Sequence, residues 1–194
     1  MSSLTDPQLT QQQVTINDRL CPFKPSKGPN VMWPAFNPSK RTFTDEGMAI
    51  TFNHDIPMRD KVLLRADIYL PETLDAPEKQ LPVVLAITPY GKQNPVDISA
   101  IPASRDFDAG FDGVVSSKYS PFEGSDPVFW TKHGFAYVVV DSRGSFASEG
   151  EKASFVSKLD GLDAYDVIEY LGSCSWSNGH VGMIGASALG AIQW

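Results

Sequence analysis

The sequence has 194 residues, enough to bury one sizeable hydrophobic core, which favours a single domain. Hydrophobic residues make up 42% and charged residues 20%, and the net charge of −7 argues against nucleic acid or an anionic membrane surface as a partner. No apolar run approaches the roughly 20 residues that span a bilayer, and the N-terminus lacks the basic and apolar regions of a secretory signal. Two cysteines, Cys21 and Cys174, are too few for a disulfide framework or a metal site. We therefore expect a cytoplasmic protein with reduced thiols and no cofactor.

Residues 1–45 are polar and rich in proline, with little periodicity. They predict an extended N-terminal arm, anchored by Trp33 and Phe36, ahead of a domain at 46–194. Two strand-like runs follow, at 48–56 and 62–70, joined by a turn sequence at 57–60. Apolar and polar residues alternate in the second run, as one buried face demands. An antiparallel hairpin at the edge of a sheet is predicted here.

Two later runs are almost wholly apolar and predict buried, central strands. Residues 82–88 read PVVLAIT and residues 135–140 read FAYVVV. Strands covered on both faces belong to parallel sheets, and ligands bind where such strands end. The first run ends at Pro89-Tyr90-Gly91, and the second ends at Asp141-Ser142-Arg143. We expect Asp141 and Arg143 to form a structural salt bridge or to lock a turn.

The segments between and after these strands predict helices. The long connection 92–125 indicates a functional loop or short helices within it. Asp126 and Pro127 predict the N-cap and first residue of a short helix that ends at His133. Apolar residues recur every third position along 159–171, which predicts a second helix. Its acidic residues are expected on a solvated face; they are Asp160, Asp163, Asp166 and Glu169.

The last sixteen residues, 179–194, read GHVGMIGASALGAIQW. A short apolar run, 181–184, leads into Gly185 and Ser187, and small and apolar residues suited to a helix follow. A strand, a sharp turn with serine at its tip and a helix together form the nucleophile elbow of α/β-hydrolases. The usual pattern is G-x-S-x-G, and here the second glycine comes one place later, at Gly190. The alternative is a serine that merely caps the helix.

The residues around Ser187 also carry a family resemblance. The segments WSNG (176–179) and VGMIG (181–185), with Ser187, Gly190 and the final QW, resemble the cocaine-esterase and X-prolyl dipeptidyl-peptidase group of serine hydrolases. The segments RADIYLP (65–71) and DSRG (141–144) resemble the same group. In that group the elbow reads G-x-S-Y-x-G, so the late glycine is expected, whereas Ala188 stands where the group has tyrosine.

The resemblance implies an α/β fold, a partial α/β-hydrolase sheet that is mostly parallel, with the N-terminal antiparallel hairpin. It implies a serine esterase or peptidase that acts on a small ester, amide or short peptide through Ser187. The hydroxyl of Tyr90 and the backbone N–H of Ala188 are then expected to form the oxyanion hole. The group carries a helical cap and a C-terminal β-sandwich, neither of which is recognisable in this sequence.

A serine needs a general base, and none of the three histidines is well placed to be one. His54 lies in the predicted hairpin, His133 closes a helix, and His180 opens the elbow strand. In α/β-hydrolases the acid and the histidine follow the serine, but residues 188–194 contain neither. We therefore expect an inactive N-terminal fragment of a longer hydrolase. The alternative is a non-catalytic hydrolase-like binding protein.

Overall fold

The computed structural model describes residues 40–72, 80–93, 116–152, 154 and 156–194. It also describes the backbone of two short strands, β1 (Val14–Ile16) and β2 (Arg19–Cys21), which pair with each other. Trp33, Phe36 and most of the predicted arm lie outside the described residues, as does most of the connection 92–125. No helix among the described residues is long and apolar enough to cross a membrane.

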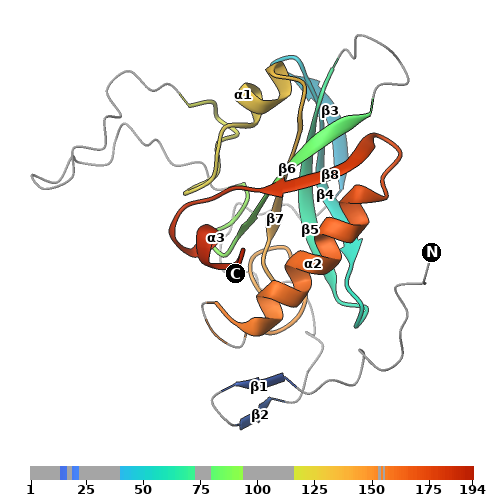
Figure 1. Ribbon diagram of the computed structural model, residues 1–194. Helices are drawn as coiled ribbons and strands as arrows, with labels where there is room; N and C mark the ends of the chain where they lie inside the picture. Colours follow the sequence, from blue (N-terminus) through green and yellow to red (C-terminus); the bar gives the residue numbers. More distant parts are fainter. Residues whose placement is uncertain are drawn as a thin grey trace, which may run out of the picture.

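A six-stranded mixed sheet forms the body of the protein (Figure 1). Its strands, in spatial order, are β3 (Arg41–Asp45), β4 (Met48–Pro57), β5 (Leu63–Pro71), β7 (Ala136–Asp141), β6 (Leu81–Thr88) and β8 (Ser177–Met183). The pairs from β3 to β7 are antiparallel, whereas β6 runs parallel to both β7 and β8. This sheet confirms the predicted partial α/β-hydrolase fold with its N-terminal antiparallel hairpin. The described strands form a mixed sheet rather than the mostly parallel one expected, because β3, β4 and β5 extend the parallel part through antiparallel pairs.

The outer strand of the antiparallel part is β3, so the predicted hairpin of β4 and β5 lies one strand in from the edge. The sheet accordingly begins at Arg41, within the segment predicted as the arm.

Within the described ranges, three helices accompany the sheet: α1 (Pro127–Lys132), α2 (Lys158–Gly172) and α3 (Ser187–Ala191). The carboxylate of Asp126 accepts a hydrogen bond from the N–H of Val128 at 2.9 Å and so caps α1 as predicted. Ser157 and Asp160 form a reciprocal capping box at the start of α2. Figure 1 shows α2 lying across one face of the sheet, with α1 and α3 away from α2.

The hydrophobic core has two halves, one on each face of the sheet. Alternate residues of β6 enter each half: Leu85 packs with the α2 side, and Ala86 packs with the side of Leu189 in α3. This double coverage confirms the prediction that 82–88 and 135–140 are buried on both faces. Burial extends to the polar face of β5, where Asp67 and Tyr69 are inaccessible. The prediction that only one face of β5 is buried was wrong. The rings of Tyr137 in β7 and of Tyr119, in the segment before α1, cover the second face.

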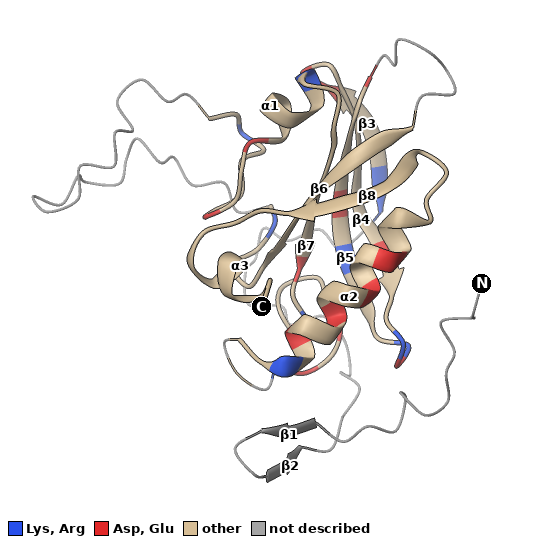
Figure 2. Ribbon diagram, viewed as in Figure 1, with Lys and Arg blue, Asp and Glu red and all other residues tan. Residues whose placement is uncertain are grey.

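Three of the four acidic side chains of α2 also differ from expectation, whereas Glu169 is exposed as predicted. Figure 2 colours several acidic positions along α2, but Asp160, Asp163 and Asp166 are buried rather than solvated. Asp163 accepts two hydrogen bonds from the guanidinium of Arg143, at 2.5 and 2.7 Å. Asp166 binds the guanidinium of Arg59 in the same way. These pairs attach α2 to the loops after β4 and β7, and they confirm a structural role for Arg143.

Candidate active site

The predicted strand and helix around Ser187 are both present. β8 ends at Met183, and the N–H of Ile184 still bonds to the carbonyl of Leu85 in β6 at 2.9 Å. α3 begins at Ser187, whose φ of +50° lies in the left-handed region that side chains rarely adopt. Strained backbone of this kind is concentrated at functional sites. The side chain of Ser187 is exposed, as a reactive hydroxyl requires.

The two glycines that flank Ser187 have steric reasons to be there. A Cβ on Gly185 would lie 2.3 Å from the Cβ of Leu189, closer than any real contact. A Cβ on Gly190 would lie 3.2 Å from the carbonyl oxygen of Gly185. The first turn of α3 therefore packs directly on the backbone of the preceding turn. A glycine three places after the serine serves this packing, which accounts for the late position of Gly190.

Tyr90 follows β6 and comes to the same edge of the sheet as Ser187. Its N–H donates to the side chain of Thr88 at 3.1 Å, which holds the turn after the strand. Its ring meets Phe122 edge to face, with the ring centroids 5.0 Å apart. Burial and the Glu123 carboxylate raise the pKa of Tyr90, while a hydrogen bond with the Ser187 side chain lowers it. The structure thus brings the two predicted side chains into hydrogen-bond contact.

Glu123 is a member of this site that the sequence analysis did not select. It lies in the turn before α1 with a φ of +58°, and its carbonyl accepts the N–H of Ala186 at 3.1 Å. Its carboxylate interacts with Tyr90, and its Oε2 atom is buried without a hydrogen-bond partner among the described residues. A glutamate in a turn carries no sequence signal of its own, because only the contact with Ala186 brings it here.

Ala188 is the second residue of α3 and is 4% exposed. The first N–H groups of a helix have no acceptor within the helix, so the N–H of Ala188 is available to a group beside Ser187. Its methyl group is buried rather than on the wall of an open pocket.

Comparison with known proteins identifies the family. The sequence profile of the X-Pro dipeptidyl-peptidase (S15 family) matches residues 60–194. The chain belongs to this family. It is 34% identical over 150 residues to the cocaine esterase of Rhodococcus sp. (strain MB1 Bresler), covering 77% of this chain and 21% of that protein. The predicted resemblance is confirmed.

Solved structures of two hydrolases share the fold. A CocE/NonD family hydrolase from Staphylococcus aureus superimposes with a TM-score of 0.63 at 27% identity, over 82% of this chain and 28% of that chain. An α-amino acid ester hydrolase superimposes with a TM-score of 0.52, also at 27% identity, over 83% of this chain and 25% of that chain. The chain therefore spans between a fifth and a third of the length of these relatives, and the proteins it resembles are hydrolases.

Two of the three histidines of this S15-family chain have other partners. His54 in β4 shares a 2.7 Å hydrogen bond with the hydroxyl of Tyr170 in α2, and burial lowers its pKa. His133 caps α1, where its Nδ1 lies 2.7 Å from the carbonyl of Phe129. His180 is exposed on β8. Among the described residues, no recorded hydrogen bond joins a histidine to Ser187.

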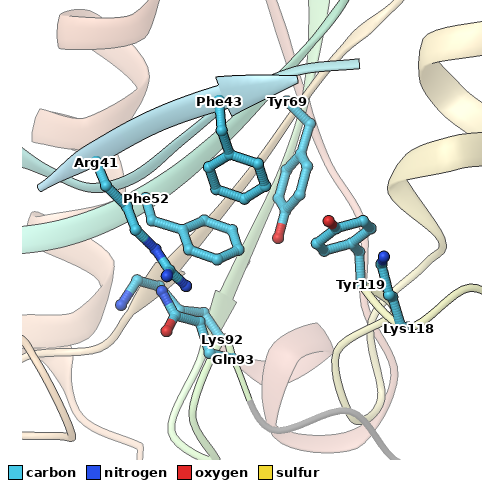
Figure 3. Close-up of a pocket in the computed structure, with 8 residues that line it drawn as sticks. All are labelled: Arg41, Phe43, Phe52, Tyr69, Lys92, Gln93, Lys118 and Tyr119. Carbon is cyan, nitrogen blue, oxygen red and sulfur yellow. The ribbon is translucent and has the colours of Figure 1, made fainter. Parts of the chain in front are cut away.

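A cavity of about 390 Å³ lies near β3 and does not include the predicted catalytic residues (Figure 3). Aromatic side chains, cationic side chains and one amide line it: Arg41, Phe43, Phe52, Tyr69, Lys92, Gln93, Lys118 and Tyr119. Neither Ser187 nor Tyr90 is among them, so this cavity is distinct from the serine site. In the part of the chain that the structure describes, no group of three or more His, Cys, Asp or Glu residues could hold a metal ion.

Proposed function

We propose that this S15-family chain carries the nucleophile of a serine hydrolase, which cleaves small esters, amides or short peptides by acyl transfer. The observation that carries the proposal is the hydrogen bond between Ser187, at the strained start of α3, and the hydroxyl of Tyr90. A serine that only caps a helix has no need of a phenol beside it or of a left-handed backbone.

In the proposed reaction, the Oγ of Ser187 attacks the substrate carbonyl carbon while a base takes its proton. The carbonyl oxygen becomes an oxyanion and accepts hydrogen bonds from the Tyr90 hydroxyl and the Ala188 N–H. Collapse of this intermediate expels the alcohol or amine, which takes up the proton, and leaves an acyl-serine. Water then attacks the acyl-serine while the base takes its proton, and collapse of the second intermediate breaks the bond to Oγ, releases the carboxylic acid and returns the proton to Ser187.

The general base is proposed to lie outside residues 1–194. The described residues bring no histidine to Ser187, and in α/β-hydrolases the acid and histidine follow the serine in the chain. Residues 1–194 alone should therefore hydrolyse an activated ester no faster than the same chain with Ser187→Ala. A clearly faster rate would mean that a residue within the chain serves as the base.

The proposal is tested by the hydrolysis of 4-nitrophenyl acetate by the full-length protein. Ser187→Ala should lower kcat by at least about 10³-fold, because the covalent pathway is lost. Retained turnover in this variant would mean that another group is the nucleophile, and a wild-type protein with no turnover above background would favour a protein that uses the hydrolase fold for binding.

A further inference from the structure

A buried charge cluster lies immediately beyond Tyr90. The side chain of Lys92 is fully buried, and its Nζ donates to Asn53 at 2.8 Å and to the carboxylate of Asp141 at 2.9 Å. The carboxylate of Asp67 lies 3.8 Å from the same nitrogen. A lysine is rarely buried without a strong reason, because moving its charge out of water is costly. Here two carboxylates and an amide oxygen surround it.

The cluster joins four strands at the edge of the sheet where Tyr90 and Ser187 meet. Asn53 lies at an irregularity of β4, Asp67 in β5, and Asp141 at the end of β7, while Lys92 follows β6. The N–H of Lys92 also donates to Asp141 at 2.8 Å, so backbone and side chain of one residue bind one carboxylate. This double attachment fixes the chain two residues after Tyr90.

The opposite side of the same turn is closed by packing. Gly91 has a φ of +96°, and a Cβ there would lie 2.8 Å from the ring of Phe146. Phe146 belongs to the loop after β7, in which the N–H of Ala147 donates to the Asp141 carboxylate at 3.2 Å. One carboxylate thus holds both the turn after β6 and the loop that covers it. Tyr90 sits on a turn fixed at both ends, by Thr88 before it and Lys92 after it.

We infer that Lys92 is a positioning residue for the oxyanion hole: its ion pair with Asp141 holds the Tyr90 hydroxyl at the site of the developing oxyanion. The inference rests on the proposed function. An oxyanion-hole donor is effective only when it is already in place before the reaction, and small displacements of such groups cost large factors in rate.

The test is a double-mutant cycle on the full-length protein with 4-nitrophenyl acetate. It compares wild type, Lys92→Met, Tyr90→Phe and the double variant, because coupling appears as non-additive loss. Lys92→Met should lower kcat by about 10- to 10²-fold with little change in KM, since only transition-state binding is affected. In the Tyr90→Phe background the same change should lower kcat by less than about twofold.

Lys92→Met leaves two buried carboxylates without their cation, so a second variant guards against loss of folding. Lys92→Met with Asp141→Asn removes the charges of the pair together, and it should fold yet show the same coupling to Tyr90→Phe. Arg59→Met is the matched control: its guanidinium pairs with the buried carboxylate of Asp166 in α2 at 2.6 Å, whereas Tyr90 packs with the other half of the core. Its kcat should stay within about threefold of wild type.

Equal fold losses from Lys92→Met in the two backgrounds would overturn the positioning role and leave the serine mechanism intact. Full kcat in the folded charge-neutral variant would overturn it as well. A Tyr90→Phe variant with kcat within about threefold of wild type would overturn both this role and the proposed oxyanion hole.

Discussion

The side chains of Tyr90 and Ser187 share a hydrogen bond, although the two residues follow different strands. β6 and β8 are parallel neighbours, so both strands end at the same edge of the sheet and deliver these residues to one place. Functional groups of open α/β sheets collect at this edge. The proposed chemistry depends on this topology more than on any cavity in the described part of the chain.

Removing the Tyr90 hydroxyl tests its role as an oxyanion donor. Tyr90→Phe in the full-length protein should lower kcat by roughly 10²–10³-fold, the usual cost of one lost donor. The thermal midpoint should hardly change, because the ring still packs on Phe122. Steady-state kinetics and a melting curve measure the two effects. A kcat within about threefold of wild type would show that the hole is built from other groups.

The turn before Ser187 should not tolerate a side chain at Gly185. Gly185→Ala forces the new methyl against Leu189 and should cost about 1–3 kcal/mol of stability together with most of the activity. Gly182→Ala in β8 is the control, because a Cβ there meets nothing within 4 Å. Urea unfolding and ester hydrolysis of both variants give the comparison. Equal behaviour of the two would mean that the turn adjusts freely.

The buried ion pairs of α2 should matter more than exposed ones. Arg143→Met removes the cation that lowers the pKa of the buried Asp163, so this carboxylate must either stay unpaired or take up a proton, which should cost about 3–5 kcal/mol. Lys118→Met breaks the pair between Lys118 and Asp45. The Lys118 side chain is 60% exposed, so this loss should cost far less. Denaturant unfolding of each variant measures the difference. Similar losses would show that the Arg143 contact is no stronger than a surface pair.

The buried carboxylate of Asp67 predicts a pH-dependent stability. Burial raises the pKa of Asp67 from 3.8 to about 6, although the charge of Lys92 lowers it. Between these two values the folded state binds more protons than the unfolded state, so stability falls as the pH rises through this window. About two pKa units correspond to up to about 3 kcal/mol.

Asp67→Asn, which cannot ionise, isolates this effect. The unfolding free energy of wild type relative to Asp67→Asn should decrease as the pH rises from 4 to 7, and it should level off above the folded pKa. Urea titrations of both proteins at several pH values provide the measurement. A difference that stays constant or grows with pH would contradict the raised pKa.

Elements with a strong local pattern were predictable from the sequence. The runs 82–88 and 135–140 are apolar throughout, and α2 has a regular helical repeat with a capping serine. The G-x-S-x-x-G pattern likewise predicted a strand before Ser187 and a helix after it. In each case the signal lies within a few neighbouring residues.

Features that depend on distant partners were not predictable. In the sequence, Asp163 and Asp166 have the pattern of a solvated helix face. In the fold they pair with Arg143 and Arg59, which lie in loops 20 and 107 residues earlier in the chain. Glu123 joins the site only because its carbonyl meets the N–H of Ala186. Pairings of this kind arise from the tertiary fold, and no local periodicity encodes them.

The central claim is that Ser187 is an activated nucleophile, and covalent labelling tests it most directly. The full-length protein is treated with a fluorophosphonate probe, digested, and the modified peptide is identified by mass spectrometry. The account predicts one label per chain, on Ser187, with labelling lost in Ser187→Ala and slowed in Tyr90→Phe. A protein that binds its ligand but leaves Ser187 unlabelled, or that carries the label on another serine, would contradict it.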